Sequence, residues 1–269
     1  MERQTGTLQP GAGANRSYVV TGGGRGIGRA VVERLLSDEG LVVAIELDPA
    51  ALAWVDDHPA SPQVMAVIGD AADEEVAERA ADLAQAAGTL TGWVNNAAVF
   101  RDASIHSVGA RTVLDLVALN LNPVVVGCAT AVRRFLAAGT AGAIVNLSSH
   151  QARQAVPGCT PYVTAKAAIE GLTRALAVEY GPHGIRVNAV APGSVSTERY
   201  EGFLDRQEPE AVARIEQEMR LLHPLGRVAH PEEIAAAIVY LLSDDASFIN
   251  GASVPVDGGR SVLARDPEA

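Results

Sequence analysis

Short apolar runs alternate with amphipathic segments along most of this chain. The apolar runs predict strands at 17–20, 41–47, 64–69, 143–147, 184–190 and 252–256, and a further strand that opens at Trp93. The segments between them have helical patterns, at 29–40, 73–87, 111–136, 161–180 and 231–242. No internal repeat or interdomain linker interrupts this alternation. The pattern predicts one α/β domain, a doubly wound parallel sheet of about seven strands with helices on both faces.

Three segments fall outside the alternation. Residues 1–16 and 264–269 are rich in glycine and polar types, so we expect tails on either side of a domain at 17–263, the first of them disordered. Residues 198–224 are polar and contain seven acids and four arginines. We expect a helical insertion that covers a site like a lid; a solvated helix pair is the alternative.

Composition excludes several classes of function. Hydrophobic residues make up 48% of the chain, ample for a core, and the net charge of −11 argues against a nucleic-acid partner. The two cysteines provide neither a disulfide framework nor metal-ligand spacing. The start lacks the apolar core of a signal peptide, and no uninterrupted apolar run approaches the ~18 residues of a membrane span. We expect a cytoplasmic protein with no metal and no membrane partner.

A glycine-rich turn joins the first predicted strand to the first helix, in the sequence TGGGRGIG at 21–28. Gly22, Gly26 and Gly28 allow a tight turn and a close approach of the backbone to a pyrophosphate. The helix that follows offers free N–H groups and the positive end of its dipole. Because this turn lies within a β-α-β unit, it predicts a dinucleotide site.

Charged residues near this turn indicate which dinucleotide binds. Glu46 ends the second strand, 18 residues after Gly28, where a carboxylate accepts from the ribose hydroxyls of NAD and repels the 2′-phosphate of NADP. Asp48 is an alternative for this role. Arg25 is the opposing signal, since a basic residue in the turn could contact a 2′-phosphate. We expect NAD.

Polar residues also follow the later strands. Asn95 and Asn96 end the fourth strand, at the edge of the sheet where ligands bind, although asparagine is also a common turn residue. In the long helix at 111–136, Pro123 removes the partner of the Leu119 carbonyl. We expect a kink beside Asn120 that could hold a water.

Ser149 follows the fifth strand, and Tyr162 and Lys166 come 13 and 17 residues later. If Pro161 opens a helix, Tyr162 and Lys166 lie one turn apart on the same face. An ammonium in this position favours the phenolate and lowers the pKa of Tyr162 from its ordinary value near 10. The pattern predicts a proton-transfer group.

Taken together, these motifs resemble the classical short-chain dehydrogenase/reductase family over residues 17–262, almost the whole chain. The matching features, all in order, are TGGGRGIG at 21–28, Asp70, NNAA at 95–98, Asn120, Ser149, Tyr162, Lys166, NAVAPGSVST at 188–197 and INGASVPVDGG at 249–259. Ala98 departs mildly from the pattern, because the family often has glycine there.

The resemblance implies roles for individual residues. Asn120, Ser149, Tyr162 and Lys166 correspond to a catalytic tetrad: Tyr162 exchanges the substrate proton, Ser149 holds the substrate oxygen, Lys166 lowers the tyrosine pKa, and Asn120 holds a water. Asn95 corresponds to an amide that steadies the sheet beside the ribose. The residues implied in cofactor binding are Gly22, Arg25, Gly26, Ile27, Gly28, Glu46, Asp70, Ala71, Asn96, Ala97, Tyr162, Lys166, Pro192, Gly193, Val195 and Thr197.

The resemblance thus implies an NAD-dependent enzyme that oxidises a secondary alcohol or reduces a ketone. Alternatives are an NADPH-dependent 3-ketoacyl carrier-protein reductase and a nucleotide sensor without turnover. Substrate contacts are expected from Ser149 and Tyr162, from the insertion, and from His150, Ala152, Val156, Pro157 and Cys159. The acidic insertion does not favour an anionic substrate. Apolar second faces on helices 111–136 and 161–180 predict a homotetramer, the common assembly of the family.

Overall fold

The structure is a computed structural model that describes residues 15–101 and 103–264. Most of the expected N-terminal tail, and the C-terminal tail from residue 265 onward, lie outside these residues. Arg16 already opens the first strand, so the folded domain begins one residue earlier than predicted.

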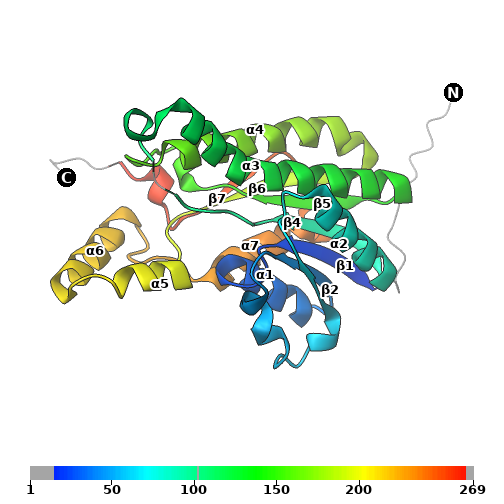
Figure 1. Cartoon of the computed structure of the whole chain (residues 1–269). Helices are drawn as coiled ribbons and strands as arrows, with labels where there is room; N and C mark the ends of the chain where they lie inside the picture. The colour runs from blue at the N-terminus through cyan, green and yellow to red at the C-terminus, as the bar shows by residue number, and fades with distance from the viewer. Residues whose placement is uncertain (1–14, 102, 265–269) are drawn as a thin grey trace.

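The seven strands form one parallel sheet in the order β3-β2-β1-β4-β5-β6-β7, as the sequence pattern predicted (Figure 1). Its strands are β1 (Arg16–Thr21), β2 (Leu41–Glu46), β3 (Val64–Ile68), β4 (Thr89–Asn95), β5 (Gly142–Leu147), β6 (Ile185–Pro192) and β7 (Ser253–Val256). The strand order reverses between β1 and β4, which are neighbours although not consecutive. A crevice forms at such a point, beyond the carboxyl ends of the strands.

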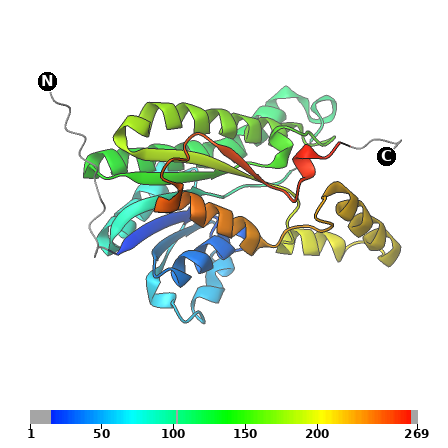
Figure 2. The same ribbon diagram turned by 180° about the vertical axis from the view of Figure 1, so that it is seen from behind.

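Helices cover both faces of the sheet. α2, α3 and α4 pack on one face, and α1 and α7 on the other, as Figure 2 shows from behind. The helices are α1 (Gly26–Ser37), α2 (Glu74–Ala87), α3 (Ile105–Ala138), α4 (Thr160–Tyr180), α5 (Glu198–Leu204), α6 (Pro209–Leu222) and α7 (Pro231–Leu242).

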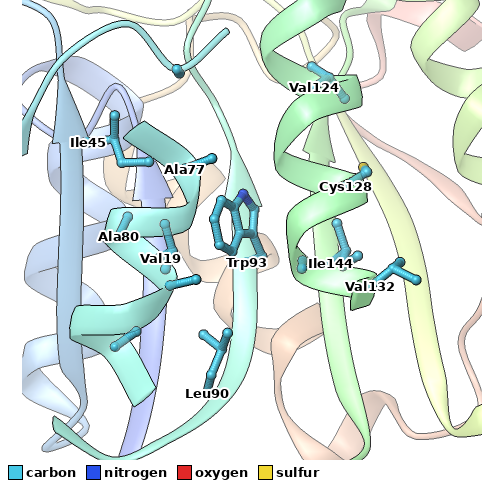
Figure 3. Close-up of a cluster of buried hydrophobic side chains, with 14 of the residues drawn as sticks. Val19, Ile45, Ala77, Ala80, Leu90, Trp93, Val124, Cys128, Val132 and Ile144 are labelled. Atoms are coloured by element: carbon cyan, nitrogen blue, oxygen red, sulfur yellow. The ribbon is translucent and has the colours of Figure 1, made fainter. Parts of the chain in front are cut away.

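The central strands are apolar on both faces, because successive side chains enter opposite cores. Val19 belongs to the core beneath α2, α3 and α4, and Val20 belongs to the core beneath α1 and α7. Trp93, fully buried, lies between α2 and α3 in the first of these cores, beside Val19 and Leu90 (Figure 3). This burial explains why the strands read as continuous apolar runs.

Several elements begin earlier than predicted, and β4 and α3 differ most. β4 starts at Thr89 and not at Trp93, because Gly92, which interrupts the apolar pattern, lies under the Tyr18 ring; an added Cβ would come within 2.6 Å of Tyr18 Cδ1. α3 starts at Ile105 and not at Arg111, with non-helical angles at Gly109 (φ 76°).

By length and composition α3 could cross a membrane. In this fold it packs against α2, α4 and the sheet, and buries Val124, Cys128, Ala131 and Phe135 in the core. A helix in a protein core can have the same length and apolar composition as a membrane span.

The polar segment at 198–224 forms α5 and α6. Both helices project from the carboxyl edge of the sheet, away from the other helices (Figures 1 and 2). None of their residues is classed as buried. Two short exposed helices at this edge lie beside the crevice that the strand order creates.

Candidate active site

A cleft of about 1310 Å³ lies at the carboxyl edge of the sheet, where the strand order reverses. Ligand pockets commonly measure about 300–1,000 Å³, so this cleft has room for two ligands together. Its walls include the glycine turn after β1, the ends of β2, β4, β5 and β6, and residues of α4 and α5.

The glycine turn packs too closely for larger residues. Gly22 (φ 65°) donates from its N–H to the Ile45 oxygen at 2.8 Å. A Cβ on Gly28 would lie 1.9 Å from the Gly22 oxygen. Asn96 fixes the turn from β4, since its Nδ2 donates to the oxygens of Thr21 and Gly22 at 3.1 and 3.0 Å. Gly28 therefore underlies the turn, while Gly22 and Gly26 line the cleft.

Glu46 and Arg25 are held in different ways. Glu46 Oε2 accepts from the Gly24 N–H at 3.0 Å, and Oε1 accepts from the Leu47 N–H at 3.0 Å. Arg25 instead pairs with Asp48 at 2.6 Å. The backbone thus orients the Glu46 carboxylate toward the turn, while the charge of Arg25 is already balanced.

The other residues expected at the cofactor are also gathered here. The residues that line the cleft include Arg25, Ile27, Glu46, Asp70, Ala71, Asn96, Ala97, Pro192, Gly193, Val195 and Thr197. Asn95 does not reach the cleft. It is buried, and it joins Trp93, Cys128 and Asn146 in a hydrogen-bonded network beneath the sheet edge.

Three of the four expected catalytic residues meet on the cleft wall. Ser149 follows β5, while Tyr162 and Lys166 lie one turn apart on α4. Tyr162 is hydrogen-bonded to Ser149, and the Lys166 Nζ lies 5.4 Å from the centre of the Tyr162 ring. Pro161 occupies the first turn of α4, as predicted. The arrangement brings one acid–base group, one hydroxyl and one cation together.

The pKa of Tyr162 differs from the prediction. Burial raises this pKa above its ordinary value of 10.0, while the hydrogen bond with Ser149 and the charge of Arg199 act in the opposite direction. Lys166 is not among these influences. Its Nζ donates to the Leu147 oxygen at 2.7 Å, and burial lowers the pKa of Lys166 itself to about 8. The predicted lowering of the tyrosine pKa by Lys166 is therefore wrong for this structure.

Asn120 lies behind the cleft wall. Its Oδ1 accepts from the Val99 N–H at 2.9 Å, and its Nδ2 donates to the Leu116 oxygen at 3.3 Å. The predicted kink beside it is also wrong, because the backbone angles stay helical through Pro123 and depart from helical values at Gly109. The amide is therefore held by the backbone of 99 and 116.

The residues expected to contact substrate divide into two groups. His150 and Val156 line the cleft together with Ser149 and Tyr162, whereas Cys159 is buried outside it, with 4% of its surface exposed. Ala152 and Pro157 are likewise not among the lining residues. His150 Nδ1 lies 3.2 Å from the Pro192 oxygen, and burial lowers the His150 pKa to about 4, so the ring is neutral.

Several lining residues were not predicted from the sequence. Phe100 packs edge-on against Tyr162, with ring centres 4.8 Å apart, and the guanidinium of Arg199 lies 4.5 Å from the Phe100 ring centre. Further unpredicted lining residues are Trp54, Gln151 and Arg260. The lining residues Arg199, Tyr200, Phe203 and Met219 belong to the insertion at 198–224, from which substrate contacts were expected. Phe100 lies two residues beyond the NNAA motif, the one sequence signal that could have indicated it.

Comparison with known proteins decides the family. A family model described as enoyl-(acyl carrier protein) reductase matches residues 22–261. The cis-4-hydroxycyclohexanecarboxylate dehydrogenase of Sinomonas cyclohexanicum is 38% identical, over 93% of this chain and 98% of the relative. The chain belongs to the classical short-chain dehydrogenase/reductase family.

Other comparisons agree with this membership. A 3-oxoacyl-[acyl-carrier-protein] reductase of Chlamydia muridarum is 33% identical, over 91% of this chain and 97% of the relative. The crystal structure of a levodione reductase superposes with a TM-score of 0.83 at 31% identity, covering 93% of this chain and 98% of that one. This short-chain dehydrogenase/reductase is accordingly an oxidoreductase with the Rossmann fold of its family.

Proposed function

We propose that the protein is an NAD(H)-dependent oxidoreductase that interconverts a secondary alcohol and a ketone, with Tyr162 as the general acid–base. The observation that carries this proposal is the cluster of Ser149, Tyr162 and Lys166 on the same cleft as the glycine turn. A proton-transfer group and a bound dinucleotide would then lie side by side. Relatives named as dehydrogenases of ring alcohols support this reaction class.

The residues present fit a nicotinamide dinucleotide. A side chain on Gly28 would collide with the Gly22 oxygen, so this turn requires glycine and leaves its backbone accessible to a pyrophosphate. The first N–H groups of α1 lack partners within the helix and suit the same anion. Gly22, Gly26, Ile27, Asp70 and the residues after β4 and β6 would hold the dinucleotide. NAD(H), when bound, supplies the hydride chemistry at its nicotinamide ring.

Residues of the chain itself would transfer the substrate proton. Tyr162 would take the proton of the alcohol during oxidation and return it during reduction. Ser149 would donate a hydrogen bond to the substrate oxygen and stabilise the charge that develops there. Lys166, whose pKa burial lowers to about 8, would relay protons to and from Tyr162. Burial raises the pKa of Tyr162, and the hydrogen bond with Ser149 opposes this rise and so favours the use of Tyr162 as a base.

Glu46 is the reason to prefer NAD. A carboxylate fixed beside the turn by the Gly24 N–H would accept from ribose hydroxyls and repel a 2′-phosphate. Arg25, the residue that would favour NADP, is paired with Asp48. An NADPH-dependent 3-ketoacyl carrier-protein reductase is the second candidate, supported by the relative of that name. A non-catalytic sensor is a remote alternative, because both Tyr162 and Lys166 are present.

The description of the family model also names enoyl reduction. Enoyl reductases of this fold have a wider spacing between tyrosine and lysine than the four residues from Tyr162 to Lys166, so we favour alcohol–ketone chemistry. The test is a panel of secondary alcohols, ketones, 3-ketoacyl thioesters and enoyl thioesters, followed at the nicotinamide absorbance with NAD(H) and NADP(H). Turnover of alcohols or ketones is the expected result. Turnover of enoyl thioesters alone would overturn the proposal.

We also propose a cytoplasmic homotetramer. Apolar side chains are exposed on the outer surfaces of the two long helices, at Leu114 and Val125 of α3 and at Val178 of α4, and Phe248 is fully exposed before β7. Association of chains would remove these side chains from water. Solution scattering should give the mass of four chains; the mass of a single chain would contradict the assembly.

A further inference from the structure

The arginines that line the cleft fall into two kinds. Arg25 and Arg29, near the glycine turn, have carboxylate partners in Asp48 and Glu33. Arg199 and Arg260, on the far side, have no carboxylate partner among residues 15–101 and 103–264. Arg260 nevertheless lies within electrostatic range of the Asp257 carboxylate. Arg199 is therefore the lining arginine whose charge no described carboxylate is shown to offset.

The acidic residues of the cleft wall are held by the turns after β1 and β3. Glu46 accepts from the Gly24 N–H, Asp70 from the Ala72 N–H at 2.9 Å, and Glu198 from the Gly26 N–H at 3.3 Å. All three carboxylates are thus held by backbone groups of the turns that follow β1 and β3. None of them is available to neutralise a cation near Tyr162.

The Phe100 ring contacts both Arg199 and Tyr162, the proton-transfer group. Its guanidinium lies 4.5 Å from the centre of the Phe100 ring, within the roughly 6 Å of a cation–π contact. Phe100 in turn packs against the Tyr162 ring at 4.8 Å. The stack sets the guanidinium one aromatic ring away from the group that would exchange the substrate proton.

Several apolar side chains also line the cleft. Val156, Phe203 and Met219 line it with Phe100. A hydrocarbon skeleton suits these side chains, whereas a guanidinium binds carboxylates through charge-assisted and often bidentate hydrogen bonds. The complementary ligand has an apolar body, a hydroxyl or keto group at one end and a carboxylate at the other.

We propose that Arg199 is a specificity-determining residue that binds the carboxylate of a hydroxy-acid or keto-acid substrate whose carbon skeleton lies against Phe100. This inference rests on the proposed function for its reacting hydroxyl, and it adds the substrate class. It also reverses the expectation from the acidic composition of 198–224, because Arg199 of that segment is a cation whose charge acts on Tyr162.

Turnover with three matched alcohols tests the proposal: 4-hydroxycyclohexanecarboxylate, its methyl ester and cyclohexanol. The wild-type kcat/KM should favour the carboxylate over the ester by about tenfold or more, the usual scale of a charged hydrogen bond. Arg199→Gln should abolish this preference mainly through KM, and should lower kcat/KM for the ester far less than for the carboxylate. Arg199→Lys should restore part of it. Arg220→Gln, which removes the same charge from α6 outside the cleft, is the matched control and should behave as wild type.

A pH profile separates binding from an effect on Tyr162. If Arg199 serves only to favour the phenolate, Arg199→Gln will lower kcat for all three alcohols equally and move the acid limb of the kcat profile to higher pH. That outcome would overturn substrate recognition by Arg199.

Cyclohexanecarboxylate, which has no hydroxyl to oxidise, tests the inference without turnover. Calorimetry with the NADH-saturated protein should give a Kd that rises about tenfold or more in Arg199→Gln and not in Arg220→Gln. Failure of every alcohol to react, with this binding intact, would count against the proposed function alone. If cyclohexanecarboxylate does not bind, or if its Kd is the same in wild type and Arg199→Gln, the inference about Arg199 is overturned.

Discussion

Lys166 Nζ donates a hydrogen bond to the backbone oxygen of Leu147 at 2.7 Å, from a side chain with 2% of its surface exposed. The ammonium therefore lies against the end of β5 and beside the Tyr162 ring, without a carboxylate partner in the described part of the chain. Removal from water without an opposing charge disfavours the ammonium, which is the reason its pKa falls to about 8.

Lys166 should titrate near pH 8 in the protein without cofactor. It is the only lysine in the sequence, so lysine labelled with ¹³C at Cε gives one resonance that reports this group alone. An NMR titration between pH 6 and 11 should show a midpoint about two units below the ordinary value of 10.5. A midpoint near 10.5 would show that the side chain is solvated and would contradict its burial.

The lowered pKa of Lys166 also determines whether the free energy of unfolding rises or falls with pH. The folded protein releases the Lys166 proton at about pH 8 and the unfolded chain at about 10.5, so between these values the unfolded state binds more protons. The free energy of unfolding should therefore rise with pH in this window, by at most about 1.4 kcal/mol per pH unit from this group. Urea unfolding of wild type and Lys166→Met should diverge accordingly above pH 8, whereas parallel profiles would contradict the shift.

Replacing Glu46 by glutamine should move cofactor preference toward NADP. The substitution removes the carboxylate that would repel a 2′-phosphate, and we expect the ratio of kcat/KM for NADP to that for NAD to rise about tenfold or more. Asp48→Asn is the informative partner variant, because it frees Arg25 and should raise the ratio less. If wild type prefers NADP, or if Glu46→Gln leaves the ratio unchanged, the choice of NAD is wrong.

Gly28→Ala should destabilise the protein by about 1–3 kcal/mol, the usual cost of overpacking. The new methyl group would lie 1.9 Å from the Gly22 oxygen and 2.6 Å from Asn96 Nδ2, so the turn must shift. Thermal unfolding and NAD titration should both report the change. Gly202→Ala is the control, since its nearest neighbour is Arg206 Nη1 at 3.8 Å. Equal behaviour of the two variants would contradict the tight packing of the turn.

The sequence predicted those parts of the structure that are determined by residues close together in the chain. The strand-turn-helix around Gly22 and the helical spacing of Tyr162 and Lys166 are set by neighbouring residues, and the structure has both. β4 began earlier than predicted because Gly92 serves the distant Tyr18 ring. That contact is tertiary, so no sequence window contains it.

The directions and contacts of side chains were the second feature that could not be predicted from the sequence. The position of Lys166 on α4 was predicted, but its bond to Leu147 depends on where β5 ends. Arg199 and Phe100 are 99 residues apart in the sequence and meet only because α5 folds over the cleft. The helix break at Gly109 rather than at Pro123 likewise shows that a proline can be accommodated within a packed helix.

The central claim is that Tyr162 exchanges the substrate proton, and Tyr162→Phe tests it most directly. Phenylalanine keeps the ring that packs against Phe100 and under Lys166, so only the hydroxyl is lost. The measurement is kcat for a secondary alcohol that wild type oxidises, together with the Kd for NADH from fluorescence. The account predicts that kcat falls by at least about 10²-fold, the usual contribution of a positioned proton donor, while the Kd stays unchanged. Near-normal turnover in Tyr162→Phe would contradict it.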